Sequence, residues 1–396
     1  MIDVVCHYFD PEKAPLLRRH FIPLARSLSA EGFAVHLDRH WLHGPHVLLR
    51  FEPGAGAEAA AERAADACRR HLAEHPSTVA VDEAALLAEA EAAGRAELVP
   101  GPYTPIRPDN TVLVREADLG ALTALLGSPQ AVAGRCALLA LGLDAVAGSL
   151  SYLADRGDTA GARITVALAA MTAHSANYPA GLGRGYQSFL SHVEDFLAHD
   201  DPGGTLRAAF DRHWSAHGPG VSAIVRAAAA HDPAVAALDH AEPTPDPALD
   251  PAPAADPAEP VPDDLRALAA GWRDWSAAAW RHADATLDTG ALIGSRNGHA
   301  AVAAGFGGET EIRWDFSRRR FSDYHELLNR SNFPRIAVSR EFGLYRFATN
   351  VLYRLLALCE LRPVERYLAA YLFSRAVEEI NGMSWRELLE PVVRSR

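Results

Sequence analysis

The sequence predicts an α+β protein in which a small N-terminal sheet precedes a mostly helical region. In the first hundred residues, strand-like alternation and helix-like spacing follow each other in the order β-α-β-β-α. That order is typical of a split βαβ, ferredoxin-like half. Beyond residue 116 helical spacing dominates, and a proline-rich stretch at 241–264 interrupts it. The 396 residues are enough for two or three ordinary domains or for one large core with an appendage.

The N-terminal part, residues 1–115, carries the predicted sheet. Pro11 suits the first turn of a helix and Gly32 suits its end. The turn His43-Gly44-Pro45 joins two short strands as a hairpin. In chain order the predicted elements are strand 2–9, a helix from 11 to 32, strands 33–42 and 46–51, helices 58–74 and 83–93, and strand 111–115.

The remainder divides into a helical region (116–240), a linker (241–264) and a C-terminal helical region (265–396) packing on the same core. Eight prolines among alanines and acids in the linker cannot bury enough apolar surface to fold, so an extended, solvated chain is expected. The predicted helices are 117–126, 131–153, 164–174, 185–199, 206–231, 265–288 and 342–380.

Composition excludes several classes of protein. The formal net charge of −12 disfavours nonspecific nucleic-acid binding. The N-terminus has no basic region followed by an apolar run, and the longest apolar stretch, 136–154, is interrupted by Asp144, so neither a secretory signal nor a membrane span is expected. The four cysteines lie far apart without metal-type spacing. A cytoplasmic protein with reduced thiols is therefore expected.

The motifs for phosphate loops, zinc proteases and serine hydrolases are absent from the sequence. Four histidines, His36, His40, His43 and His46, crowd the hairpin. Imidazole is a common metal ligand, but alternation places neighbours on opposite faces and no carboxylate or thiolate completes a recognisable set. A polar hairpin with one functional histidine is the favoured interpretation, with no metal and no cofactor.

Three segments in order carry a family resemblance. The hairpin from Arg39 to Phe51 resembles the signature R-Y-x-D-P-G-P-H-L-R-L-R-F of the C-terminal elimination domain of class I lanthipeptide (lantibiotic) dehydratases and its stand-alone thiopeptide relatives. The segment 185–192 looks like another part of that family, and 325–330 matches its H-x-x-x-N-R box. The ordered set covers most of the chain.

The resemblance implies a site for a glutamylated Ser or Thr, in which two arginines of the first signature and one of an R-Y-G-G segment grip the glutamate carboxylate. A guanidinium suits that task because it binds a carboxylate bidentately. This chain keeps Arg50, but Leu48 replaces the first arginine. The R-Y-G-G segment is replaced by one that runs from Tyr103 to Asn110. These departures count against glutamate elimination.

The thiopeptide pyridine synthases, a branch of the same family, are compatible with the loss of the first arginine and of the R-Y-G-G segment. The resemblance then implies an enzyme that joins two dehydroalanines by a formal [4+2] aza-cycloaddition and releases water and the leader peptide, leaving a pyridine macrocycle. Such chemistry needs positioned proton donors and acceptors rather than a cofactor. The candidate catalytic residues are Tyr186, Ser188, His192 and His325, and the candidate substrate-binding residues are Arg39, His46, Arg50, Tyr103, Asn329 and Arg330.

Each candidate also has a purely structural interpretation. His192 can be a satisfied core histidine beside Phe189 and Phe196, and Ser188 can cap its helix beside Tyr186. Tyr103 can pack under its proline-rich turn. Arg330 can be a surface ion pair, and Arg50 can face either a cavity or solvent.

The expected partners are the precursor peptide, its leader and core, and other enzymes of the pathway; a homodimer stays open. The dense basic run Arg318-Arg319-Arg320 is the candidate leader-binding site, with a solvated loop as the alternative. Two other functions remain: a stand-alone glutamate eliminase that uses Arg50, Arg107 and His325, and a noncatalytic module that binds the precursor.

Overall fold

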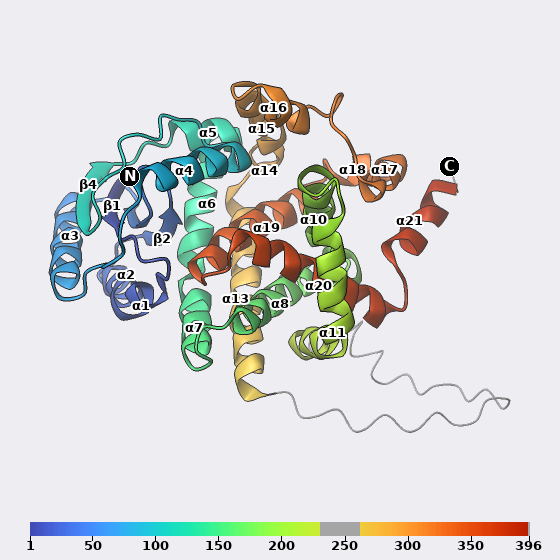
Figure 1. Cartoon of the computed structure of the whole chain (residues 1–396), viewed down its shortest axis with the longest axis horizontal. Helices are drawn as coiled ribbons and strands as arrows, with labels where there is room; N and C mark the ends of the chain where they lie inside the picture. Colours follow the sequence, from blue (N-terminus) through green and yellow to red (C-terminus); the bar gives the residue numbers. More distant parts are fainter. Residues whose placement is uncertain (230–261, 395–396) are drawn as a thin grey trace.

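A computed structural model describes residues 1–229 and 262–394 of the chain. The predicted α+β class is confirmed: a four-stranded sheet lies near the N-terminus, and the rest of the described chain is helical (Figure 1). One continuous hydrophobic core joins the sheet to the helices on both sides of the undescribed stretch.

The sheet has the strand order β2-β3-β1-β4 and is antiparallel throughout. Its strands are β1 (Ile2–His7), β2 (Val35–His40), β3 (His46–Phe51) and β4 (Thr111–Glu116). The two central strands pair with Val4 opposite Leu49 and Asp3 opposite Arg50. This register decides which side chains share a face, because alternate residues of a strand point to opposite sides.

The two faces of the sheet differ in chemistry. One face is apolar, with Val4, Cys6, Leu37, Leu49 and Phe51 buried in the hydrophobic core. The helices α2 (Ile22–Ala30) and α3 (Ala57–Glu74) contact strands of this sheet. The opposite face carries polar and charged residues, namely His36, Asp38 and His40 of β2, His46 and Arg50 of β3, and Asp3 and His7 of β1.

The helices before the undescribed stretch mostly follow the predicted pattern. They are α1 (Ala14–Leu16), the π-helical turn η1 (Leu17–Phe21), α2, α3, α4 (Glu83–Glu97), α5 (Gly120–Leu126), α6 (Pro129–Leu141), α7 (Leu143–Ala154), α8 (Ala160–Ala176), α9 (Leu182–Gly185), α10 (Gln187–Asp200) and α11 (Thr205–Ala228).

After the undescribed stretch the chain is again helical. The elements are α13 (Asp263–Thr286), α14 (Thr289–Ile293), α15 (Ser295–Ala304), α16 (Gly308–Trp314), α17 (Asp323–Arg330), α18 (Phe333–Ile336), α19 (Arg340–Leu358), α20 (Pro363–Asn381) and α21 (Trp385–Arg394). The long helix α13 packs against α6, α7, α8, α11 and α19 and so forms the centre of the helical body (Figure 1).

Two long predicted helices are wrong, because each is two helices in the structure. The segment 131–153 breaks at Gly142, where an added Cβ would lie 2.5 Å from the Leu355 side chain. The segment 342–380 breaks between α19 and α20, where Glu360 has a φ of +62° and Pro363 starts the second helix. Proline suits a first turn but cannot donate the backbone hydrogen bond of a helix interior.

Of the predicted linker, residues 241–261 lie outside the described residues. Its end is helical, since Asp263 and Asp264 form the first turn of α13, where carboxylates favour a helix N-terminus. As for membrane spans, no single described helix has the length and apolar character to cross a bilayer; α5 and α6 meet those criteria only as a pair, bent by 99°.

Candidate functional site

A cavity of about 1360 Å³ lies between the polar face of the sheet and the helical body. Its wall on the sheet side includes Asp38, His46 and Arg50, and its helical wall includes residues of α10, α15, α17, α19 and α20. Ordinary small-molecule pockets measure about 300–1,000 Å³, so this cavity accommodates a larger ligand.

On the sheet wall, Arg50 is engaged by a carboxylate of the chain itself. Its Nε donates to Asp3 Oδ1 at 2.6 Å and its Nη2 donates to Asp3 Oδ2 at 2.8 Å. Asp3 is 1% exposed and Arg50 12% exposed, so the pair is largely desolvated. Both bidentate positions are filled. A substrate carboxylate would have to displace Asp3 to bind Arg50 in the same way.

A second charged cluster ties the sheet to two helices. Asp38 of β2 accepts from Arg135 of α6 at 3.1 Å and from Arg354 of α19 at 2.7 Å. These guanidinium groups hold the pKa of Asp38 well below its usual range, although burial opposes them and is the largest single influence. Arg39 donates to Glu360 at 2.8 Å, so the chain that follows α19 is also tied to the sheet.

Three histidines of the polar face, His7, His40 and His46, lie side by side on β1, β2 and β3. Burial lowers the pKa of His46 to about 4, while His40 and His7 are likewise depressed. The His46 ring contacts those of His40 and His7, with centroids 5.9 and 5.1 Å away. Within the described residues, one trio, His36, Glu52 and Cys136, brings three ligand atoms within 4.8 Å of one another.

On the helical wall, α10 presents a polar stripe to the cavity. Ser188, Ser191, His192 and Asp195 line it, while Phe189, Leu190 and Val193 pack into the core. The spacing i, i+3, i+4 and i+7 places the four polar residues on one side of a helix. The stripe therefore follows from the local sequence once the helix is known.

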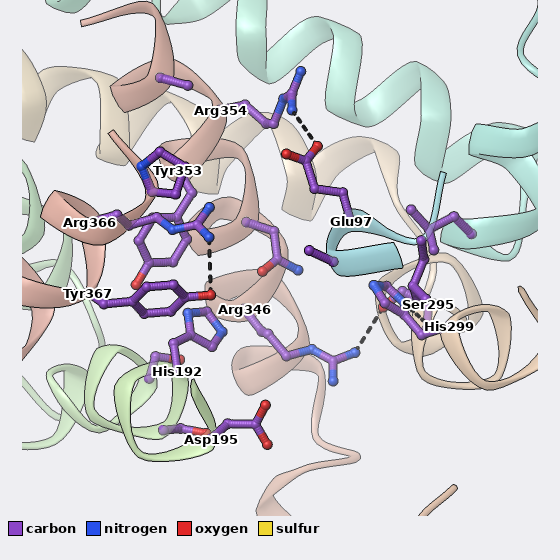
Figure 2. Close-up of a pocket in the computed structure, with 18 of the residues that line it drawn as sticks. Glu97, His192, Asp195, Ser295, His299, Arg346, Tyr353, Arg354, Arg366 and Tyr367 are labelled. Carbon is purple, nitrogen blue, oxygen red and sulfur yellow. Dashed lines mark hydrogen bonds and ion pairs between the residues drawn. The ribbon is translucent and has the colours of Figure 1, made fainter. Parts of the chain in front are cut away.

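Figure 2 shows His192 beside two tyrosines and an arginine that come from α19 and α20. The His192 ring lies 5.1 Å from that of Tyr353. The guanidinium of Arg366 lies 5.3 Å from the Tyr353 ring and donates to the Tyr367 hydroxyl at 3.2 Å. Burial, followed by the positive charges of Arg366 and Arg346, lowers the pKa of His192 to about 3. His192 is therefore a neutral imidazole near pH 7.

His325 of α17 lies between two hydroxyl groups. Its Nε2 is 2.9 Å from Ser191 Oγ, and its Nδ1 is 2.8 Å from Ser322 Oγ. Ser322 also caps α17 by accepting from the His325 backbone N–H. Burial, then Arg319 and His199, lowers the His325 pKa to about 4. Because a neutral imidazole donates through one nitrogen and accepts through the other, the three side chains can pass a proton along a chain.

The remaining predicted catalytic and binding residues are placed differently. Ser188, Asn329 and Arg39 line the cavity, as His46 and Arg50 do. Tyr186 is 1% exposed and lies in the core, and Tyr103 packs over Gly94 and donates to the Val99 carbonyl. Neither tyrosine is among the cavity-lining residues, and Arg330 is exposed outside that set.

The three arginines of the basic run predicted for leader binding differ in their surroundings. Arg318 pairs with Glu311 and Asp315, at 2.6 and 2.5 Å. Arg319 is 9% exposed, pairs with Asp195 and lines the cavity. Arg320 is exposed. Internal carboxylates therefore already occupy two of the three guanidinium groups.

Sequence reasoning missed Ser191, Tyr353, Arg366 and Tyr367. Ser191 was detectable, because it shares the helical side of Ser188 and His192. The other three come from a segment whose many leucines indicate a core helix, and helical spacing alone does not show that its polar side faces a cavity. Arg107, assigned to the eliminase alternative, is exposed and outside the cavity-lining residues.

Comparison with known proteins finds the fold but no sequence relative. No protein-family profile matches the chain, and no protein of curated function matches it significantly. The fold is shared with a solved pyridine synthase over nearly the whole chain. That protein is TbtD from thiomuracin biosynthesis, with a TM-score of 0.61, 19% identity, and coverage of 96% of this chain and 98% of the other.

A second solved structure, TsrL, is similar over 99% of this chain and 98% of its own, with a TM-score of 0.56 and 15% identity. At such identities the likeness concerns the fold. The resemblance inferred from the three sequence segments is thus confirmed at the level of the fold.

Proposed function

We propose that this protein is a thiopeptide pyridine synthase, an enzyme that joins two dehydroalanines of one precursor peptide. The observation that carries the proposal is a large cavity with neutral imidazoles and phenols in a fold shared with TbtD. The sheet adds a finer proposal, a ferredoxin-like half, supported by the order β2-β3-β1-β4 and its antiparallel pairing.

The reaction begins with a proton shift. The amide before one dehydroalanine must become its iminol, which moves a proton from nitrogen to oxygen and creates a 2-azadiene. A neutral imidazole can take the first proton and return it, and we assign that role to His192. Burial raises the pKa of Tyr353, which keeps its hydroxyl protonated as a hydrogen-bond donor. Arg366 holds Tyr367 beside it.

Ring formation needs orientation above all. Carbon–carbon bonds form when the azadiene meets the second dehydroalanine at about 3–3.5 Å, and positioning of this kind contributes roughly 7–11 kcal/mol. Two distant residues of one peptide must enter the cavity together, and its volume and the walls from sheet and helices suit that task.

Aromatisation then expels two groups. Loss of the iminol oxygen as water requires a proton on it, and loss of the leader requires a proton on its amide nitrogen. The products are the pyridine macrocycle, water and the leader carboxamide. We assign proton delivery to the Ser191–His325–Ser322 chain, which can relay protons without carrying a lasting charge.

The pairing of Arg50 with Asp3 counts against the glutamate eliminase, and Arg107 does not line the cavity. No specific observation in the described residues favours the alternative of a noncatalytic module that binds the precursor. The proposed partner is a dehydrated, thiazole-bearing precursor with its leader. The proposed location is the cytoplasm.

The test compares His192→Gln and His325→Gln with the unaltered enzyme on two peptides. One is a precursor that contains two dehydroalanines, and the other is a glutamylated precursor. We expect cyclisation of the first only, slowed about 10²–10⁴-fold in both variants. Leader binding unchanged in both variants serves as the folding control. Glutamate loss from the second peptide would contradict the proposal.

A further inference from the structure

A cluster of three metal-ligating side chains lies at the edge of the sheet's polar face, outside the cavity wall. His36 comes from β2, Glu52 follows directly after β3, and Cys136 comes from α6. Their ligand atoms all lie within 4.8 Å of one another. His36 is 3% exposed and Cys136 1% exposed, while Glu52 is half-buried.

The side chains of His36 and Glu52 are not engaged by other side chains of the described structure. Within residues 1–229 and 262–394, no hydrogen bond joins the His36 or Glu52 side chain to another side chain. An imidazole nitrogen, a carboxylate oxygen and a thiol sulfur from three separate elements are therefore already gathered close enough to bind one ion.

The charges around the cluster suit a divalent cation. Arg50 contacts the Cys136 thiol, but its charge is already balanced by Asp3. A thiolate from Cys136 and the carboxylate of Glu52 together supply two negative charges. The other charged groups around the cluster are Asp38 of β2, which pairs with Arg135 of α6, and the Met1 amino group near Glu52. The trio therefore neutralises a dication without a change in the Arg50–Asp3 pair.

We propose that His36, Glu52 and Cys136 form a zinc site that fastens β2 and the end of β3 to α6. Sulfur, nitrogen and oxygen ligands of this kind favour zinc, in a tetrahedron whose fourth position takes water. Binding converts the Cys136 thiol to a thiolate bound to the metal and releases one proton to solvent; no electron is transferred. The role is structural, because the three side chains lie outside the cavity lining.

Cobalt(II) is the direct probe, because it takes the same ligands and is coloured. Full-length, untagged protein is stripped with a chelator and titrated with Co²⁺. We expect one equivalent to give a thiolate-to-cobalt band in the near ultraviolet and tetrahedral visible bands, both lost when Zn²⁺ is added. Affinity should rise about tenfold per pH unit, since one proton leaves on binding.

Variants locate the site. Cys136→Ser should abolish the thiolate band, and His36→Gln should weaken binding at least about tenfold. The matched control is Cys68→Ser, which removes another buried cysteine and should leave the band intact. If Cys136→Ser does not fold, Glu52→Gln tests the site instead, because Glu52 is half-buried. Its cobalt affinity should fall at least about tenfold, as in His36→Gln.

Three outcomes would overturn the proposal. The first is cobalt binding without a thiolate band, which would place the metal on surface histidines such as His71 and His75. The second is a band that persists in Cys136→Ser or disappears in Cys68→Ser. The third is full affinity in Glu52→Gln and His36→Gln. None of these outcomes depends on cyclisation activity, so the proposed function stands or falls separately.

Discussion

Replacement of Arg50 by Met separates an internal ion pair from a substrate-binding arginine. If the partner of Arg50 is Asp3, its removal leaves a carboxylate that is 1% exposed without a counter-charge. Breaking a buried pair from one side costs about 3–5 kcal/mol. Asp3→Asn should lower the stability by a similar amount, because it leaves the Arg50 guanidinium without a counter-charge.

The double variant Asp3→Asn/Arg50→Met sharpens this prediction. It removes both charges, so its loss of stability should be smaller than the sum of the single losses by about 1–3 kcal/mol. The assay is urea denaturation followed by circular dichroism, with the midpoints compared at equal slope. The control is Arg26→Met, which breaks an exposed pair with Asp144 and should shift the midpoint much less.

The reasoning would be refuted if Arg50→Met unfolded at the urea concentration of the unaltered protein. It would also be refuted if the double variant lost the full sum of the single losses. In either case Arg50 is not held by Asp3 in solution. Arg50 would then again be a candidate for binding a carboxylate of the substrate.

Further outcomes follow from the buried histidines and the basic run. The cyclisation rate should not fall between pH 8 and 5.5, because the His192 pKa of about 3 keeps its imidazole neutral over that range. A rate that halves with an apparent pKa near 6.5 would contradict this. His174, buried between Ser276 and Thr349, has a pKa lowered to about 3. Below about pH 6.5 the unfolded chain binds this proton and the folded chain does not, so stability falls as the pH falls. His174→Gln should reduce that slope by up to about 1.4 kcal/mol per pH unit, and an unchanged slope in urea titrations would count against it. Arg320→Glu should weaken leader binding several-fold more than Arg318→Glu, because carboxylates already hold Arg318; equal losses in fluorescence anisotropy would refute the distinction.

The sheet was predictable because its signals are local. Alternation, the turn at His43-Gly44-Pro45 and the apolar run of 46–51 led to a strand that the structure confirms from His46 to Phe51. Helix breaks were harder. The break between α6 and α7 falls at Gly142, where the side chain of Leu355, more than two hundred residues away, leaves no room for a Cβ, and no local pattern contains that contact.

The site was only partly predictable for the same reason. His192 and His325 were identified through segments that resemble a family, and both line the cavity. Their partners depend on long-range packing: Ser191 meets His325 across 134 residues, and Tyr353 meets His192 from another helix. The Asp3–Arg50 pair required the strand register, which brings the two residues opposite one another.

The most direct test of the central claim is the intact mass of the leader fragment released from a precursor with two dehydroalanines. The account predicts a leader that ends in a carboxamide, formed together with a macrocycle that has lost water. A leader that ends in a carboxylate would indicate simple hydrolysis. That result, or an unchanged precursor with a correctly folded enzyme, would contradict pyridine formation by this protein.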